Sequence, residues 1–224
     1  MADNLATARV GEPTRALLIS GTVAGPLYIV VVLLQMLTRD GYDISRHPAS
    51  MLSNGAQGWI QIANFMATGL LFVACAIGLR QVLRRAAGPG RTWGPLLIGV
   101  LGAGMVAAAF FSADPSDGFP PGTPAGPPTT VSVSGMMHFL VAGIAFLALI
   151  AACFVFARRF AAAGNRGWAA FSAATGALFL AGWVSVFALQ GSRAANIAFA
   201  VAIALVLIWT SLLAARLLTR PDGG

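Results

Sequence analysis

Charged side chains are scarce in this chain, and lysine is absent altogether. Only 9% of the 224 residues are charged, whereas 58% are hydrophobic. A chain this apolar cannot remove all of its hydrophobic surface from water by folding on itself, so a lipid bilayer has to be its solvent. Arginine alone supplies the basic charge behind the net +7. Because the arginines lie at the ends of apolar stretches rather than on one solvated face, we exclude nucleic acid as a partner.

Cysteines and the usual catalytic motifs are also nearly missing. Cys75 and Cys153 lie inside apolar stretches, with no second cysteine or histidine at ligand spacing, so we expect them to be buried packing residues. The chain has no phosphate-binding glycine loop, no haem motif and no Gly-x-Ser-x-Gly elbow. Its two histidines and few carboxylates could bind zinc, but their spacing is not that of a zinc site. We therefore predict neither a metal nor a cofactor.

Apolar stretches long enough to cross a bilayer, which takes about 20 helical residues, occur repeatedly along the chain. We predict a single all-α domain over residues 1–224, a polytopic bundle of six transmembrane helices. The first stretch is longer than the apolar part of a signal peptide, and no small-residue cleavage site follows it. The predicted spans are 16–38, 59–79, 93–113, 136–157, 168–189 and 195–218.

Arginines without acids collect in alternate connections, and arginines also flank the first and last spans. By the positive-inside rule, these segments and both termini are cytoplasmic. Arginine as the only basic residue, together with abundant alanine and glycine, favours a GC-rich bacterial genome and hence the bacterial plasma membrane. The arginines in question are Arg9, Arg15, Arg80, Arg84, Arg85, Arg91, Arg158, Arg159, Arg166, Arg216 and Arg220.

The predicted outer side carries mixed charge instead, which topology does not require. An ionisable group inside a spanning helix is a functional hypothesis by default, and His138 lies in the opening turns of the fourth span. It is close enough to the outer surface to meet Asp114 or Asp43, so these three residues form the predicted catalytic centre. The polar residues of this side include Asp40, Asp43, Asp114, Asp117, His47 and His138.

The first outer loop contains a helix signal at Pro48. Proline favours the first position of a helix and keeps the preceding His47 out of the helical region. We predict a short helix along the membrane surface that places His47 beside Ser50, with residues 51–52 dipping toward lipid. A continuous helix from Asp43 would also bring these polar groups to one face, but the proline disfavours it.

Structural roles are the alternative for both outer loops. In the first loop, Asp43 would bond backbone amides and Arg46 would pair with an acid of the same loop. The second loop, roughly residues 114–135, is long enough to be either functional or disordered. Its prolines predict a stiff, extended segment. Asp114-Pro and Asp117-Gly are also common turn dipeptides.

Three segments occur in a recognisable order: GYDISRHPASMLSNGAQGWIQIANF, SADPSDGFPPG and SGMMHFLVAG. Together they resemble the domain-of-unknown-function 998 family of bacterial six-span membrane proteins, over about residues 16–217. The resemblance implies no established activity, and the stretch 123–130 is longer than we expect for the family, which leaves the alignment of Asp117 open. It does imply that such proteins tend to be polar at the positions of Asp43, Ser50–Ser53, Asp114, Asp117 and His138.

A looser similarity, in ingredients only, is to small actinobacterial membrane-bound terpene cyclases. Their chemistry starts when a carboxylic acid protonates an alkene, and aromatic faces then stabilise the cations that form. Asp114 follows two phenylalanines, which fits that chemistry. The predicted substrate-binding residues are His47, Ser50, Asp117, Phe110, Phe111, Phe119 and Trp183.

We therefore predict an outward-facing site that binds or transforms an amphipathic, lipid-like or prenylated substrate in contact with membrane lipids. In the enzymatic version Asp114 or Asp43 is the acid and His138 orients or tunes it. The alternative is a non-enzymatic membrane-organising or transport-associated protein. Gly21 and Gly25 form a small-residue pattern that serves either packing within the bundle or a homo-oligomer.

Overall fold

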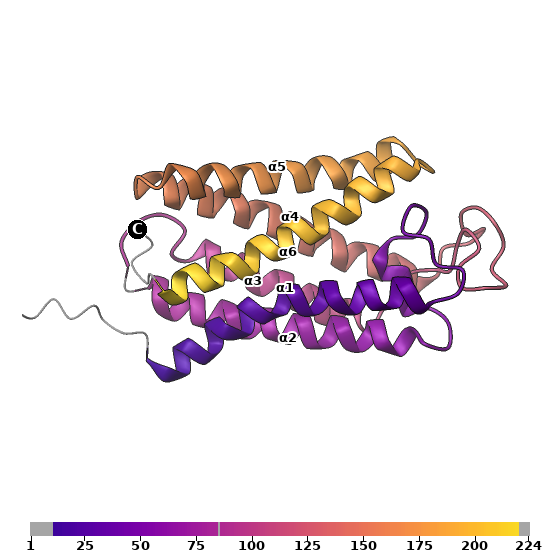
Figure 1. The fold of residues 1–224 in the computed structure, drawn as a ribbon, viewed down its shortest axis with the longest axis horizontal. Coiled ribbons are helices and arrows are strands. Elements are labelled where there is room, and N and C mark those ends of the chain that lie inside the picture. The colour runs from indigo at the N-terminus through magenta and orange to yellow at the C-terminus, as the bar shows by residue number, and fades with distance from the viewer. Residues whose placement is uncertain (1–10, 85, 220–224) are drawn as a thin grey trace, which may run out of the picture.

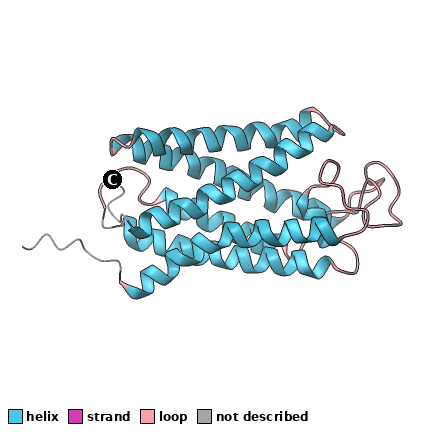
Figure 2. Cartoon of the chain, viewed as in Figure 1, coloured by secondary structure: helices cyan, strands magenta, loops and turns pink. Residues whose placement is uncertain are grey.

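The computed structural model of this chain describes residues 11–84 and 86–219. Arg9, Arg85 and Arg220, which support the predicted topology, lie outside the described residues. The described residues form six α-helices and one short 3₁₀ helix, and their only β contact is an isolated bridge between Ser116 and Phe119 (Figure 2). The elements are α1 (Glu12–Thr38), η1 (Ala49–Ser53), α2 (Gly58–Leu83), α3 (Trp93–Ala108), α4 (Val133–Ala162), α5 (Arg166–Ala188) and α6 (Arg193–Thr219).

Among the described helices, the five other than α3 are long and apolar enough to cross a membrane. The molecule is therefore a membrane-type helical protein, as predicted. α3 has 16 residues, which corresponds to about 24 Å of helix. The span predicted over 93–113 is thus helical only as far as Ala108. Large apolar side chains are exposed on the helices, a surface suited to lipid rather than water, among them Leu34, Leu37, Leu147, Val184 and Val201.

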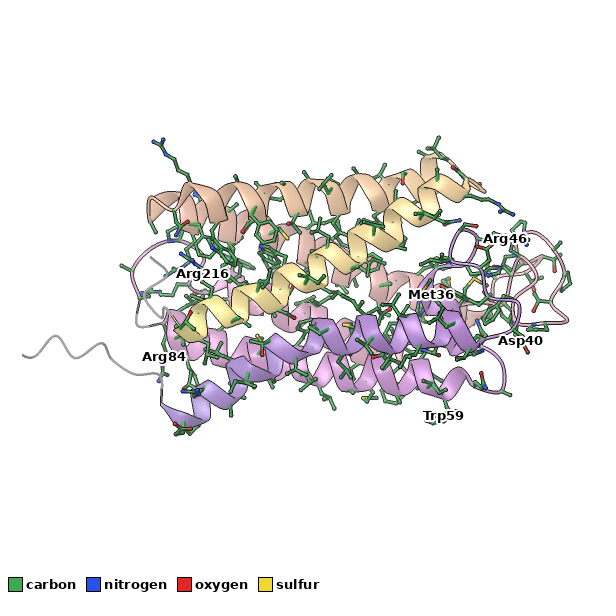
Figure 3. All side chains as sticks on the ribbon, viewed as in Figure 1. Met36, Asp40, Arg46, Trp59, Arg84 and Arg216 are labelled. Atoms are coloured by element: carbon green, nitrogen blue, oxygen red, sulfur yellow. The ribbon has the colours of Figure 1, made fainter. Side chains whose placement is uncertain are left out.

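The helices form a closed ring in chain order, because each packs against the next and α6 packs against α1 (Figure 1). The loops 39–57, 109–132 and 189–192 lie at one end of the ring, which we call the loop end. The connections 86–92 and 163–165 lie at the other, the arginine end. Figure 3 shows Asp40 and Arg46 at the loop end and Arg84 and Arg216 at the arginine end.

Glycines bring the helices close together. A Cβ atom at Gly25 would lie 2.5 Å from the carbonyl oxygen of Leu207 on α6, and one at Gly21 would clash with the sulfur of Cys75 on α2. Ser211 of α6 also donates a hydrogen bond to the Gly21 carbonyl at 2.9 Å. The small-residue pattern of α1 is thus occupied by contacts within the chain. A homo-oligomer through this face would require α2 and α6 to move away.

The two halves of the ring are filled differently. Toward the arginine end, large aromatic side chains occupy the centre. The ring centroid of Phe156 lies 6.0 Å from that of Trp209 and 6.4 Å from that of Phe160, and all three side chains are fully buried. The indole nitrogen of Trp209 donates to the Ser172 hydroxyl at 3.0 Å, which satisfies its one polar atom. Toward the loop end the centre is incompletely filled, and a cavity remains there.

Candidate functional site

The first loop folds around η1. The predicted short helix is present, and Pro48 directly precedes it. Met51 and Leu52 are buried within the protein, so the prediction that they dip toward lipid is wrong. The cause is Arg39, whose guanidinium donates hydrogen bonds to the carbonyls of Leu52 (3.0 Å) and Asn54 (2.5 Å) and holds η1 against the end of α1.

The second loop, residues 109–132, is folded back on itself. The amide of Asp117 donates to the Gly126 carbonyl at 2.8 Å, and the amide of Gly118 donates to the Pro124 carbonyl at 3.1 Å. The prediction of a stiff, extended segment is therefore wrong. Gly118 and Gly126 have φ values of 87° and 88°, left-handed conformations in which glycine lets the chain reverse between the prolines.

A salt bridge joins the two loops. Arg46 donates from Nη2 and Nε to the two carboxylate oxygens of Asp117 at 2.8 and 3.2 Å, which holds the pKa of Asp117 below its usual range. Arg46 thus pairs across loops, not within its own as the structural alternative predicted. Asp43 instead accepts from the hydroxyl (2.6 Å) and amide (2.9 Å) of Ser45, which lowers the pKa of Asp43. Its bonding to a backbone amide is as that alternative predicted.

The buried ring of His47 hydrogen-bonds to the backbone of both loops. Its Nδ1 accepts from the backbone amide of Asp43 at 3.0 Å, so in the neutral ring Nε2 carries the proton and donates to the Asp117 carbonyl at 3.1 Å. Both ring nitrogens are therefore engaged. Tyr42 donates from its hydroxyl to the His47 carbonyl at 2.8 Å. This histidine has no hydrogen-bonding capacity left for the substrate that the sequence assigned to it.

Phe119 is the apolar centre of the same cluster. It is 0% exposed and is surrounded by the Tyr42 ring at 5.4 Å, the His47 ring at 5.4 Å and the Arg39 guanidinium at 5.2 Å. A guanidinium over an aromatic face is favourable where water is excluded. We call Arg39, Tyr42, His47, Asp117 and Phe119 the loop clamp.

The end of α3 explains the position of His138. After Ala108 the chain leaves the helix, so the carbonyl groups of the residues that follow have no partners within the helix and need others. The missing bonds are supplied by side chains from neighbouring elements. His138 Nδ1 lies 2.8 Å from the Phe111 carbonyl, Ser134 donates to the Ser112 carbonyl at 3.0 Å, and Asn54 donates to the Ala113 carbonyl at 3.0 Å.

Asp114 lies against the first turn of α4. One of its carboxylate oxygens accepts from the backbone amide of Ser132 at 3.0 Å, and a Cβ atom at Gly135 would clash with the same carboxylate. Ser132 in turn caps the helix by accepting from the amide of Gly135 at 2.9 Å. A negative charge at a helix N-terminus is stabilised by the unpaired amides and the helix dipole. Asp114 therefore helps to fix where α4 begins.

A cavity of about 400 Å³ lies between these groups and the centre of the ring. This is within the range of pockets that hold small ligands, about 300–1,000 Å³. Its polar lining is confined to few side chains, Ser50, Asp114, Ser116, His138 and Tyr28. The rest is apolar and rich in aromatic rings, including Phe65, Phe139, Phe146, Phe179, Trp183, Phe187 and Phe199.

The structure brings part of the predicted site together. Asp114, His138, Ser50 and Trp183 line the cavity, and their roles in binding or catalysis stay predictions. The predicted three-residue centre is not formed, because Asp43 is bonded to Ser45 away from the cavity. The other predicted residues outside the cavity lining are His47, Asp117, Phe110, Phe111 and Phe119. Of these, His47 lines a second, smaller hollow.

The excluded phenylalanines have separate roles. Phe110 is 71% exposed, Phe111 contributes only its carbonyl to His138, and Phe119 belongs to the loop clamp. In the part of the chain that the structure describes, no three His, Cys, Asp or Glu side chains converge to hold a metal ion.

Sequence reasoning included Trp183 in the predicted site but missed most of the other aromatic residues of the walls and a polar chain beside them. Tyr28 of α1 lines the cavity, and its hydroxyl accepts from Gln61 at 3.3 Å. Gln61 accepts from Gln35 at 2.8 Å, and Asn64 donates to the Tyr28 carbonyl at 3.3 Å. A signal was present, because amide side chains are costly inside apolar spans and find partners there. Phe146 is the centre of the aromatic wall, 5.2–5.8 Å from the rings of three neighbours.

Comparison with known proteins adds one finding. No curated protein and no solved structure matches the chain. The sequence model of a family described as "Protein of unknown function (DUF998)" matches residues 22–216. Because that match covers most of the chain, the protein belongs to the DUF998 family, as its loop segments predicted.

Proposed function

We propose that this protein binds the apolar body of a lipid-like molecule in the cavity between its helices, with the polar head at the loop end. The observation that carries the proposal is the asymmetry of the cavity lining. Aromatic and aliphatic side chains form its walls, whereas Ser50, Asp114, Ser116 and His138 gather where the loops meet the helices. A pocket with apolar walls and a few convergent polar groups is the usual form of a small-molecule site.

In this proposal the loop end faces the outside and all six helices cross the membrane. The short α3 completes its crossing through residues 109–113, and side chains satisfy the carbonyl groups of the last three of these residues, as membrane depth requires. At the arginine end, the connection 86–92 carries Arg91, and Arg158, Arg159 and Arg166 flank the connection 163–165, with no acid among them, which supports a cytoplasmic location for that end and for both termini. Trp59 and Trp93, exposed at opposite ends, fit the two interfacial belts.

The ligand enters sideways from the outer leaflet. A second hollow of about 200 Å³ lies between α1 and α6. It shares Tyr28 and Phe199 with the main cavity, and exposed apolar side chains, Leu33 and Val201, form part of its lining. An apolar chain can therefore pass from lipid to the cavity without meeting water. The buried aromatic packing around Trp209 supports a closed-ended site rather than a transport path to the arginine end.

Acid-initiated cyclisation has less support than binding. That reaction needs an isolated carboxylic acid that can give its proton to an alkene. Asp114 is the only carboxylate in the described cavity lining, and it accepts from the Ser132 amide at the start of α4. This contact places one carboxylate oxygen of Asp114 on the backbone at the start of α4. The aromatic walls would suit a carbocation, but the acid that would create it is not favoured by this geometry.

The experiment that tests binding uses Trp183 as a reporter. Purified protein is titrated with a lipid analogue whose chain carries bromine, which quenches nearby tryptophan fluorescence. We expect saturable quenching that is lost in Trp183→Phe, because this side chain lines the cavity. A non-saturable signal, or one unchanged in Trp183→Phe, would contradict the proposal.

A matched pair of glycine variants controls for the fold. Gly143 lines the cavity, and a Cβ atom there would have only the Trp183 ring in reach, at 3.9 Å. Gly143→Leu should therefore fill cavity space without a clash and weaken binding about tenfold or more, by displacing apolar contact area. Gly167→Leu adds the same side chain where nothing lies within 4 Å, outside the cavity lining, and should bind normally.

A further inference from the structure

The two ionisable groups of the cavity lining, His138 and Asp114, are both biased toward accepting hydrogen bonds. From this bias, and resting on the proposed function, we infer that the ligand's head is a hydrogen-bond donor without negative charge, of which a hydroxyl is the simplest. Phospholipids, prenyl diphosphates and fatty acids are disfavoured by the same geometry. The argument has three steps: the state of His138, the environment of Asp114, and the position of the arginines.

His138 presents an acceptor. Its Nδ1 lies 2.8 Å from the Phe111 carbonyl, and a carbonyl oxygen can only accept, so Nδ1 carries the ring proton. In the neutral ring Nε2 therefore has a lone pair. No described group hydrogen-bonds Nε2, although the side chain is only 4% exposed and lines the cavity. A ligand hydroxyl placed there would give this nitrogen its missing donor.

Asp114 adds a second acceptor and a negative charge. Its Oδ2 accepts from the Ser132 amide, and no described donor hydrogen-bonds Oδ1. A carboxylate has acceptor sites for several donors, so capacity remains on the side of the cavity. The hydroxyls of Ser50 and Ser116 can donate or accept, and that of Tyr28, which accepts from Gln61, can still donate, so these hydroxyls favour neither kind of head.

Arginines that could neutralise an anionic head are held elsewhere. None of the described arginines lines either hollow. Arg39 is bonded to the carbonyls of Leu52 and Asn54, and Arg46 is bonded to Asp117. A phosphate or carboxylate head would lie near Asp114 in an apolar cavity with no cation in its walls, which is costly for charge that has lost its water.

The test compares matched probes that share one brominated chain and differ only in the head. They are the alcohol, its methyl ether, which accepts but cannot donate, and its phosphate monoester, which is anionic. We expect the alcohol to bind about tenfold tighter than the ether, because the ether cannot donate a hydrogen bond to an ionised or buried acceptor. The affinity of the alcohol should exceed that of the phosphate ester by a larger factor. Equal or tighter binding of the ether or the phosphate ester would overturn the inference.

A charge-removing variant separates this inference from the proposed function. Asp114→Asn keeps an acceptor for the Ser132 amide while removing the negative charge. The phosphate ester should gain affinity several-fold relative to the alcohol, and an unchanged ratio would refute the role of Asp114. If none of the probes quenches Trp183 in folded protein, the binding proposal itself fails. If all bind alike, the cavity binds chains and only the head assignment is wrong.

Discussion

The loop clamp and the polar end of the cavity, where His138 and Asp114 lie, contain similar side chains but differ in how far their hydrogen-bonding groups are used within the protein. Each has one histidine and one aspartate. In the clamp, His47 uses both ring nitrogens and Asp117 is paired with Arg46, so the polar capacity is used within the protein. At the polar end of the cavity, His138 and Asp114 each satisfy one backbone group and keep an atom without a described partner. Residue type therefore does not distinguish a structural cluster from a binding site here, whereas unused hydrogen-bonding capacity beside a cavity does.

The largest effect should come from emptying the clamp. Phe119→Ala removes a fully buried ring that Tyr42, His47 and Arg39 surround. Truncation of a buried phenylalanine costs about 3–5 kcal/mol, so we expect a large drop in thermal stability in detergent. Limited proteolysis should cut the loop 109–132 much faster.

Phe110→Ala is the matched control, because that ring is 71% exposed and touches neither the clamp nor the cavity lining. It should change stability by about 0.5 kcal/mol or less. Where Phe119→Ala remains folded, its affinity for the alcohol probe should stay close to that of the unmodified protein. An affinity loss as large as that of Gly143→Leu would show that the clamp and the cavity are not separate regions.

Sequence reasoning predicted the features that local patterns encode and missed those that depend on how the helices and loops pack. Five helices of membrane-spanning length, the short helix after Pro48 and the family were predictable, because apolar length, proline and loop motifs are local signals. The cavity walls were not, since these helices are apolar on every face and periodicity does not reveal which side of Phe146 or Phe199 looks inward. The placement of Phe119 depends on how two loops dock, which no local pattern encodes.

His138 shows how a correct residue was found with an incomplete reason. An ionisable group in a span marked it, and the structure places it on the cavity. Its bond to the Phe111 carbonyl arises because α3 ends at Ala108, and the apolar run through 113 gave no sign of that ending. The expected partnership with Asp43 did not form, because that carboxylate accepts from Ser45 through one oxygen and lies outside the cavity lining.

Two substitutions separate the structural bond that His138 makes through Nδ1 from the acceptor that it presents at Nε2. Their effects on stability should be smaller than that of Phe119→Ala. The amide of asparagine reaches the position of Nδ1, so His138→Asn should keep the bond to the Phe111 carbonyl and lose the acceptor at Nε2. We expect near-normal stability and about tenfold weaker binding of the alcohol probe. Glutamine reaches the position of Nε2, so His138→Gln should retain more affinity.

The same His138→Gln variant should lose about 1–3 kcal/mol of stability, the cost of a buried carbonyl without a partner. Thermal melting and bromine quenching on the same samples measure both quantities. Full affinity in His138→Asn would mean that Nε2 is not used by the ligand and that this histidine, like His47, has only a structural role.

The smallest effect on stability should come from the salt bridge between Arg46 and Asp117 of the clamp, and the pH dependence of Tm measures that effect. Arg46 lowers the folded-state pKa of Asp117, so the stabilisation is complete above the ordinary value of an aspartate, about 4, and is lost as pH falls through the lowered value. Because the side chains of Arg46 and Asp117 are 37% and 35% exposed, we expect Asp117→Asn to lower Tm by only about 1–2 °C at neutral pH.

As the pH falls from about 4 through the lowered pKa of Asp117, the Tm of the unmodified protein should converge on that of the Asp117→Asn variant, because protonated Asp117 no longer pairs with Arg46. Part of the acid response should persist in the variant, since Ser45 lowers the pKa of Asp43 as well. Affinity for the alcohol probe at neutral pH should not change, because Asp117 does not line the cavity. A deficit in Tm that stays constant from neutral to acidic pH would show that the ion pair with Arg46 is not its source. A variant that binds the alcohol probe poorly would show that the clamp and the cavity are not separate regions.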